Sequence, residues 1–478
     1  DRSPSRGLGD VYKRQILHMV EMLDIQLKRR TWTRIQKISQ LPKFVMKDRP
    51  YLCTAPWTHT YVSPQGERRL CCASREEASF QKQYLDSGTA EGKFEPQSLK
   101  EHWNSDYMKD IRKRMLAGEK LKQCQVCNDQ VLNLHTYRQY FTETLFPHKV
   151  EDIIATTRED GHYDKMPVSY DYRISNLCNF KCRMCGEQLS SSWEAEKKKH
   201  NLIDVKQDPW MEPTTRKKIS NFQEEVLEEE LQKAVDNKTI EEIYWVGGEP
   251  LMWERHWTIM QQLVDNGHAK NVTIRYNTNL SRVKYKDYNL WDMLPHFKNV
   301  NICASIDGAY DVGEYIRDGL VWSEWIENFK SGMFLIDQFG DDALVFDVTL
   351  TTPGLFHLDK LIDVASSLDI KSYFKFTYAF DPSVVMSPFC LPKDVLLPQV
   401  DSLIQHIEER MTWKTKVYKD SLVSLINRES FDEQWPDTYK DGLKRGKQFQ
   451  EYLDNLRNSK LKFVDTLHGN AVDWWNRI

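Results

Sequence analysis

Three cysteines stand close together in the run CNFKCRMC, where Cys178, Cys182 and Cys185 follow the spacing CxxxCxxC. Three thiolates can bind only three irons of a cubane iron–sulfur cluster, so the fourth iron stays open for a substrate or cofactor. Structural zinc sites use four ligands and favour two CxxC pairs. No fourth cysteine or histidine follows closely, and His200 is the nearest candidate. The spacing therefore favours a cluster that does chemistry.

A second group of cysteines lies nearer the start of the chain. One cysteine precedes a predicted hairpin with its turn at residues 64–66, two adjacent cysteines follow that hairpin, and a CxxC pair lies beyond a predicted helix at 99–116. Four thiolates make a complete ligand set, so this site is expected to be closed. Spacing alone leaves open a zinc ribbon or an iron–sulfur cluster. The candidate ligands are Cys53, Cys124 and Cys127 together with one of the adjacent Cys71 and Cys72.

The composition is that expected of an intracellular enzyme. The 478 residues leave room for about two or three domains and a large core. A net charge of -4 gives no bias towards nucleic acid or anionic membrane, and no run approaches the ~20 apolar residues of a membrane span. Ten cysteines are too few and too clustered for a disulfide scaffold. We therefore expect a cytoplasmic location, no nucleic-acid partner and no membrane partner.

The central part of the chain, about residues 165–385, alternates between strand and helix patterns. This rhythm predicts an α/β fold with parallel strands joined by right-handed crossovers. A charge-rich insertion at 201–239 is expected at the surface. The predicted strands are 168–175, 241–247, 271–278, 299–306, 343–351 and 370–378, and the predicted helices 187–200, 221–235, 256–266, 323–337 and 357–368.

The run at 178–185 resembles the cluster loop of the radical S-adenosylmethionine enzymes, and GGEP at 247–250 resembles the second signature of that superfamily. The six strand–helix units then match the partial (β/α)6 barrel of the superfamily. The resemblance implies a catalytic 4Fe–4S cluster on the three cysteines, with S-adenosylmethionine at the open iron. Electron transfer into the cofactor would break a carbon–sulfur bond and yield a 5′-deoxyadenosyl radical.

The resemblance also implies contacts to the cofactor. The two glycines of GGEP permit close backbone approach, and their carbonyls with Glu249 could accept bonds from the cofactor ammonium. Arg317 resembles the arginine that pairs with the cofactor carboxylate, with a surface salt bridge as the alternative. Phe180 and Tyr378 could pack near adenine, although a plain core role is open for Phe180. The expected cofactor-binding residues are Phe180, Gly247, Gly248, Glu249, Asn277, Ser305, Asp307 and Arg317, and Asn279 ends the same strand as Asn277.

Several predicted strands alternate apolar and polar side chains, whereas parallel strands buried on both faces are nearly all apolar. With helices outside, the apolar faces must point outward and the polar faces must line the barrel lumen. Unpaired buried charges are costly, so the lumen is either a ligand cavity, which we favour, or a dense ion-pair network. The polar positions include Asp171, Arg173, Arg275, Asn277, Asp307 and Asp347.

Cys303 lies on the polar side of its predicted strand. A thiol in the lumen could donate a hydrogen atom to a substrate radical, which makes Cys303 a candidate catalytic residue. The alternative is a small buried hydrophobic residue, as most free cysteines are.

The spacing of the early cysteines around Gly66 resembles the twitch form of the SPASM auxiliary-cluster domain, which implies a second 4Fe–4S cluster. The glycine spacing of that pattern selects Cys71 as the ligand, with Cys72 as the alternative. In that family the domain usually follows the barrel, whereas here it precedes it. The expected segments are 1–15, which resembles translated adapter sequence; 16–47, a helical lead-in; 48–130, the auxiliary-cluster module; 131–164, a linker; 165–385, the partial barrel; and 386–478, a helical C-terminal region.

The sequence thus predicts a radical enzyme that abstracts hydrogen from a substrate carbon, followed by oxidation or crosslinking. The expected partners are a small polar molecule or a peptide as substrate and a flavodoxin or ferredoxin as electron donor. Two rival classes stay open. One is a binding protein whose cysteines hold zinc, and the other is a scaffold of the same fold that binds a peptide without turnover.

Overall fold

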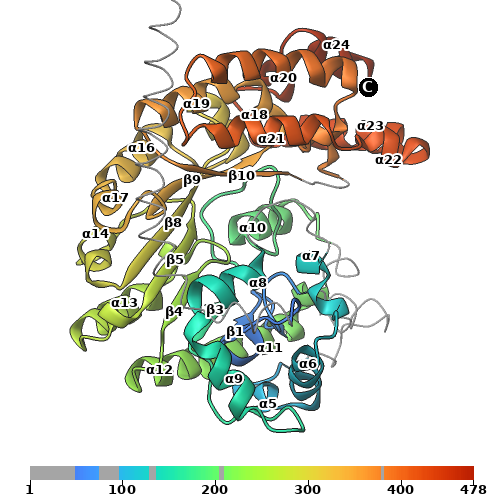
Figure 1. The fold of residues 1–478 in the computed structure, drawn as a ribbon. Coiled ribbons are helices and arrows are strands. Elements are labelled where there is room, and N and C mark those ends of the chain that lie inside the picture. Colours follow the sequence, from blue (N-terminus) through green and yellow to red (C-terminus); the bar gives the residue numbers. More distant parts are fainter. Residues whose placement is uncertain (1–48, 75–95, 129–135, 204–208, 378–381) are drawn as a thin grey trace, which may run out of the picture. The chain divides into compact units, whose positions relative to one another are not determined.

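The computed structural model describes residues 49–74, 96–128, 136–203, 209–377 and 382–478 (Figure 1). The chain forms two compact units. The first holds the described residues of Asp1–Thr58, Ala73–Arg75 and Trp103–Met166, and the second those of His59–Cys72, Glu76–His102 and Pro167–Ile478. The predicted segments 1–15 and 16–47 lie wholly outside the described residues. Tyr378 also lies outside them.

The second unit is built on one eight-stranded sheet. Six parallel strands follow one another across it in chain order, which confirms the predicted α/β fold and all six predicted strands. This succession is that of an open (β/α)6 barrel. The six strands are β3 (Ser169–Tyr172), β4 (Glu242–Trp245), β5 (Thr273–Thr278), β8 (Asn299–Ser305), β9 (Leu344–Leu350) and β10 (Ser372–Phe376).

The sheet continues beyond β3 through the predicted hairpin. Strand β1 (His59–Val62) pairs parallel with β3, and β2 (Arg68–Arg69) pairs antiparallel with β1. Gly66 in the turn has a φ of 80°, which glycine adopts without steric cost. The hairpin therefore adds a seventh parallel strand to the barrel sheet, and the sequence patterns gave no sign of this pairing.

Helices cover one side of the sheet (Figure 1). On β5, Ile274 and Tyr276 are buried, while the alternate residues Arg275 and Asn277 are partly exposed, as the predicted alternation requires. The apolar face and the helices share one hydrophobic core. The covering helices include α12 (Glu228–Asp236), α13 (Glu254–Asp265), α16 (Trp322–Ser331), α17 (Phe334–Phe339) and α19 (Leu358–Ser367). Helix α10 (Ser191–Lys199) follows the cysteine loop.

The charge-rich insertion does not lie wholly at the surface, so that expectation was wrong. It forms α11 (Pro213–Asn221), the π-helical turn η6 (Phe222–Leu227) and α12. Phe222, Leu227 and Leu231 are buried in the core of the sheet, at helical spacing around a run of glutamates. The insertion thus contains the crossover helix between β3 and β4.

The C-terminal region is helical, as predicted, and packs on the barrel. It comprises α20 (Lys393–Glu408), α21 (Lys416–Ile426), α22 (Phe431–Gln434), α23 (Pro436–Leu456) and α24 (Asn470–Arg477). The predicted docking positions Val400, Leu403 and Ile407 are buried in the common core, and Ile404 packs against it. Trp474 and Trp475 are also buried in this core, so the end of the chain packs on it.

The first unit is mainly helical. The predicted helix at 99–116 is interrupted, because Ser105 caps a separate helix α6 (Asp106–Leu116) after α5 (Leu99–Trp103), and α5 belongs to the second unit up to His102. Buried Arg112 on α6 donates from Nε to the carbonyl of Pro56 at 2.9 Å. Later in the unit, α9 (Val150–Thr156) packs Val150 and Ile153 inward. No helix among the described residues is long and apolar enough to span a bilayer.

Candidate metal centre

The three-cysteine loop begins beyond the carboxyl end of β3, where serines at the start of α10 hold its backbone. The N–H of Cys178 donates to Ser191 Oγ at 3.1 Å, and Ser192 Oγ donates to the carbonyl of Cys178 at 2.8 Å. Ser190 Oγ donates to the carbonyl of Phe180 at 2.6 Å and also caps α10. The chain itself therefore sets the course of the loop. A serine run before a helical pattern is the sequence signal that could have revealed these contacts.

The three thiols are partly buried and lie close enough to raise one another's pKa. Burial is the main cause, and it raises the pKa of Cys178 to about 12 and raises the pKa of Cys182 and of Cys185. The thiols are thus protonated at neutral pH in the free protein, and metal binding would release the protons.

The spacing of the three thiols in the sequence is that of cluster ligands. Among the described residues, no three or more His, Cys, Asp or Glu side chains converge on one ion site. A cubane cluster takes one thiolate at each of three irons, so its ligands stand apart around it. The three cysteines of this loop can supply one thiolate to each of three irons.

Arg317 lies beside these thiols. Its guanidinium lowers the pKa of all three cysteines, against the effect of burial. It is only 8% exposed, and its Nε lies 2.8 Å from Oδ2 of fully buried Asp307. Asp307 also accepts a bond from the N–H of Thr349 at 2.9 Å, although burial raises its pKa. Arg317 is therefore part of a buried ion pair, and the alternative of a surface salt bridge is wrong.

Glu249 is already bonded to the protein. Its buried carboxylate accepts from Thr278 Oγ1 at 2.6 Å, from the N–H of Asn279 at 2.5 Å and from the N–H of Leu251 at 3.0 Å. Burial raises its pKa to about 7. The side chain thus ties the end of β5 to the turn after β4. This role differs from the expected contact with a cofactor ammonium, which stays a prediction.

The two glycines after β4 allow a close backbone approach to the segment that leads into the cysteine loop. A Cβ at Gly248 would lie 2.3 Å from the carbonyl oxygen of Leu177, and one at Gly247 would lie 3.2 Å from Cβ of Arg173. Gly247 also has a φ of 134°, which other residues rarely adopt. The N–H of Glu249 donates to the carbonyl of Leu177 at 2.6 Å. Glycine is needed here for contact between chain segments.

The two asparagines at the end of β5 point to different neighbours. Asn279 Nδ2 lies 3.9 Å from Cys178 Sγ and donates to Asn179 Oδ1 at 3.0 Å, so it belongs to the cysteine loop. Asn277 Nδ2 donates to Asp347 Oδ2 at 2.7 Å, and Asn277 Oδ1 accepts from the hydroxyl of Tyr244. Asn277 therefore belongs to the polar face.

Phe180 is 1% exposed and lies in the hydrophobic core. A Cβ at Gly319 would lie 2.8 Å from its Cδ1, so the ring packs directly against that glycine. Phe180 therefore has the core role that the sequence left open. Contact with adenine stays a prediction.

The polar face of the sheet carries the dense ion-pair network that the sequence allowed as the alternative to a cavity. Arg173 pairs with Asp171 at 3.0 Å, Arg275 with Glu242 at 3.3 Å and Lys375 with Asp347 at 2.7 Å. The acids are buried, whereas the bases are partly exposed or, for Lys375, half-exposed. Charges on this face are thus paired, and a ligand cavity over it stays a prediction.

Cys303 lies on this polar face, as predicted from the alternation. Its register partner on β5 is Asn277, and its buried Sγ lies 3.7 Å from Asn301 Oδ1. Burial raises the pKa of Cys303 to about 12. Ser305, two residues on, stands opposite Asp347 in the pairing of β8 with β9.

The early cysteines fall in both units. In the first unit Cys53 is buried, and burial raises its pKa to about 12, with smaller contributions from nearby Cys124 and Cys127. Cys71 and Cys72 follow β2 directly and belong to the second unit. The four-cysteine ligand set stays a prediction.

Comparisons with known proteins agree with these motifs. Residues 172–331 match the family model of the radical SAM superfamily, and residues 53–128 match that of an iron–sulfur cluster-binding domain, SPASM. No curated protein sequence matches the chain.

Two crystal structures of Streptococcus suis SuiB are similar at 12% sequence identity. The complex with S-adenosylmethionine has a TM-score of 0.32 and covers 69% of this chain and 67% of SuiB. The complex with the precursor peptide SuiA has a TM-score of 0.33 and covers 69% and 68%.

The two family matches contain the CxxxCxxC loop and the early CxxC pair, respectively. They imply a 4Fe–4S cluster with S-adenosylmethionine for the first segment and auxiliary iron–sulfur ligation for the second. The chain thus carries a radical S-adenosylmethionine superfamily domain at residues 172–331, preceded in the sequence by a SPASM iron–sulfur cluster-binding domain at residues 53–128.

Proposed function

We propose that Cys178, Cys182 and Cys185 hold the catalytic cluster and that the enzyme abstracts hydrogen from a polar substrate bound over the polar face of the sheet. When bound, the cluster and S-adenosylmethionine supply reductive cleavage to a 5′-deoxyadenosyl radical. The protein binds and orients the reactants and excludes water. Oxidation or crosslinking of the substrate follows.

The observation that carries this proposal is the buried guanidinium of Arg317 beside three thiols. A cation in a buried site lowers the free energy of nearby anions, so Arg317 favours thiolate ligation over the protonated thiols. The Arg317–Asp307 pair at 2.8 Å leaves further guanidinium N–H groups, which could bind the carboxylate of the cofactor. Asn279, 3.9 Å from Cys178 Sγ, adds an amide donor at the same loop.

The polar face supports a small polar substrate, with a peptide as the second possibility. Arg173, Arg275 and Asn277 are partly exposed there, so they can form hydrogen bonds to hydroxyl, phosphate or carboxylate groups. Their acidic partners keep them in place. An apolar substrate would remove water from these groups without offering them hydrogen bonds, at a large cost.

Cys303 is our candidate hydrogen-atom donor for a substrate radical that is reduced instead of being oxidised or crosslinked. The S–H bond breaks, a C–H bond forms on the substrate, and the thiyl radical left behind takes an electron from the flavodoxin or ferredoxin donor and a proton from water. The raised pKa keeps the thiol protonated at neutral pH, and only the protonated form carries a transferable hydrogen. In the Cys303→Ala variant, we expect S-adenosylmethionine cleavage to continue while formation of the reduced product falls. Unchanged product formation would assign Cys303 to the core.

The test of the proposal is iron and sulfide content after anaerobic reconstitution, with dithionite-driven cleavage of S-adenosylmethionine in the same sample. We expect about eight irons per chain, for two 4Fe–4S clusters. The C178A/C182A/C185A variant should retain about half of the iron and form no 5′-deoxyadenosine. The C53A/C124A variant should lose the other half and keep cleavage.

Other outcomes would redirect the assignment. Bound zinc without cleavage would contradict the enzyme mechanism proposed here and leave a zinc-stabilised binding protein. About four irons with cleavage intact would keep the catalytic cluster and remove the auxiliary one. Iron without cleavage would favour the scaffold that binds a peptide without turnover.

A further inference from the structure

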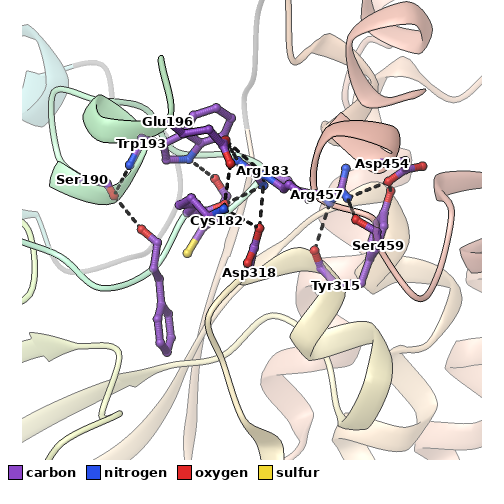
Figure 2. A network of polar contacts seen from close by, with 12 residues as sticks. Cys182, Arg183, Ser190, Trp193, Glu196, Tyr315, Asp318, Asp454, Arg457 and Ser459 are labelled. Atoms are coloured by element: carbon purple, nitrogen blue, oxygen red, sulfur yellow. Dashed lines mark hydrogen bonds and ion pairs between the residues drawn. The ribbon is translucent and has the colours of Figure 1, made fainter. Parts of the chain in front are cut away.

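Arg183, which lies between two of the cluster cysteines in the sequence, is buried and bonded to the C-terminal region. Its Nη2 lies 2.6 Å from Asp454 Oδ1 and donates to Ser459 Oγ at 2.9 Å. Its Nη1 donates to Gln450 Oε1 at 3.0 Å, and its Nε donates to the carbonyl of Tyr315 at 3.0 Å. All three guanidinium nitrogens therefore have partners, and three of the four bonds go to α23 or the segment just after it (Figure 2).

Asp454 is the acidic partner of this arginine and is itself fixed. It accepts from the hydroxyl of Tyr315 at 3.0 Å and from the N–H of Phe463 at 2.8 Å. The ring of Tyr315 lies under the Arg183 guanidinium, 3.8 Å from its Cζ. The buried pair thus has the additional bonds that such a pair needs in order to persist.

Arg457, the residue at the C-cap of α23, also contacts the loop. Its Nη1 donates to the carbonyl of Lys181 at 3.0 Å. Its Nη2 lies 2.7 Å from Glu196 Oε2, and its Nε lies 3.2 Å from Asp318 Oδ2. The guanidinium also stacks on the ring of Trp193 at 4.3 Å. Only 4% of the Arg457 side chain is exposed.

In the sequence, Cys182 lies between Lys181 and Arg183, the two loop residues that these contacts hold, and Figure 2 shows it beside the network. Trp193 Nε1 donates to the carbonyl of Cys182 at 2.8 Å. On either side, the N–H of Lys181 donates to the carbonyl of Asp318 at 2.7 Å, and the N–H of Arg183 donates to that of Ile316 at 2.9 Å. The loop backbone is therefore fixed around one cluster cysteine.

The charges of the network balance. Three cations, Lys181, Arg183 and Arg457, face three carboxylates, Glu196, Asp318 and Asp454. Removal of Arg183 or Asp454 would leave the other as an unpaired buried charge, and removal of Arg457 would leave two carboxylates, Glu196 and Asp318, to share Lys181. Docking of α23 alone would need no such set, because Leu443 and Leu453 already bury apolar surface on it.

We propose that Asp454 and Arg457 are positioning residues for the catalytic cluster. They hold residues 181–183 in the conformation that presents the Cys182 thiol, although neither residue touches the reacting atoms. The C-terminal region thereby takes part in cluster binding. This inference rests on the proposed function, because Asp454 and Arg457 can affect cluster binding only if Cys182 is a cluster ligand.

The first test is hydrogen exchange of the iron-free full-length chain, read at the amides of Lys181 and Arg183. Arg457→Met keeps the apolar stem and removes the guanidinium, and Arg457→Lys keeps the charge. The matched control is Lys414→Met, because Lys414 is a buried C-terminal cation, 9% exposed, that pairs with Asp369 at 2.9 Å away from the loop. We expect R457M to speed exchange at both loop amides at least about tenfold, R457K less, and K414M not at all.

The second test is the rate at which the reconstituted protein loses iron to a chelator. R457M and Asp454→Asn should lose the catalytic cluster at least about tenfold faster than the wild type and K414M. Equal loop exchange in R457M and K414M at matched melting temperature would overturn the inference. If R457M does not fold, the comparison of R457K with K414M decides in the same way. If the proposed function is wrong, the reconstituted wild type will contain no iron. The hydrogen exchange of the Lys181 and Arg183 amides in the iron-free chain would still follow the prediction.

Discussion

The two faces of the barrel sheet differ in how their side chains are used, although the same strands form both. The helix-facing side is mostly apolar and buried, so it supplies the hydrophobic stabilisation of the fold. The polar face carries paired charges and amides, and such pairs contribute little net stability. Alternation along a strand lets one segment serve both purposes. Examples on the apolar face are Tyr276, Ile302 and Phe346, and on the polar face Asn277, Cys303 and Asp347.

The largest expected effect is on the apolar face. Phe346 is fully buried and packs against Phe329 and Trp325, with ring centroids 4.7 and 5.3 Å away. Phe346→Ala should lower the free energy of unfolding by about 3–5 kcal/mol, because it leaves a cavity. Urea denaturation measures this, and Ser305→Ala on the polar side of β8 is the control. A loss no larger than that of the control would contradict the assignment of stability to the apolar face.

A pH dependence should also arise on the helix side. Burial lowers the pKa of His256 from 6.5 to about 3, and its Nε2 lies 2.7 Å from the hydroxyl of Tyr276. The unfolded chain binds a proton below pH 6.5 that the folded chain does not, so stability is complete above that pH and falls as the pH drops. Between pH 6.5 and about 5, this residue should reduce the free energy of unfolding by roughly 2 kcal/mol.

The measurement is urea denaturation of the wild type and of the H256F/Y276F variant at about pH 7 and about pH 5. The double variant removes the titrating group without leaving the tyrosine hydroxyl alone. Its stability should fall less with acid than that of the wild type. Equal slopes for the two proteins would show that His256 is not buried as described.

A smaller loss is expected on the polar face. Asp347 accepts from Asn277 at 2.7 Å and from Lys375 at 2.7 Å, and it is buried. Asp347→Ala should lower the free energy of unfolding by about 1–3 kcal/mol, because Asn277 loses its acceptor. Thermal and urea unfolding would both report it. A loss greater than that of F346A would reverse the comparison between the faces.

The smallest effect is expected for the other partner of the same pair. The Lys375 side chain is 53% exposed, so water already solvates much of its charge. Lys375→Met should change the free energy of unfolding by less than about 1 kcal/mol. The same denaturation series gives the value, and adding salt to the wild type should mimic the change. A change as large as that of D347A would mean that this ion pair is shielded from water.

The six strands and the place of the cysteine loop could be predicted because both leave local signals. Alternation between neighbours such as Arg275 and Tyr276 is visible within one strand, and CxxxCxxC is a run of eight residues. The core role of residues 222–236 was obscured because Leu227 and Leu231 flank three consecutive glutamates. The high charge of that segment predicted a surface position, whereas the helical spacing of its apolar residues indicated a buried face.

Contacts between distant segments left no such signal. Arg183 and Asp454 are 271 residues apart, and α23 holds several other charged residues, so nothing in the sequence selects that partner. The three donors on the Glu249 carboxylate come from two separate turns. The pairing of β1 with β3 could not be predicted from the sequence either. All four residues of β1 are buried, so the strand has no alternation that would mark one face.

The place of β1 has consequences for how the protein folds and stays soluble. His59 and Ser169 lie on adjacent strands 110 residues apart in the chain, so this pairing closes a long loop and is entropically costly to form early. A fragment cut to begin at β3 would expose that strand as an open edge, which can recruit strands from other chains. The native sheet ends instead at β2, two arginines long, and a short charged edge strand discourages such aggregation.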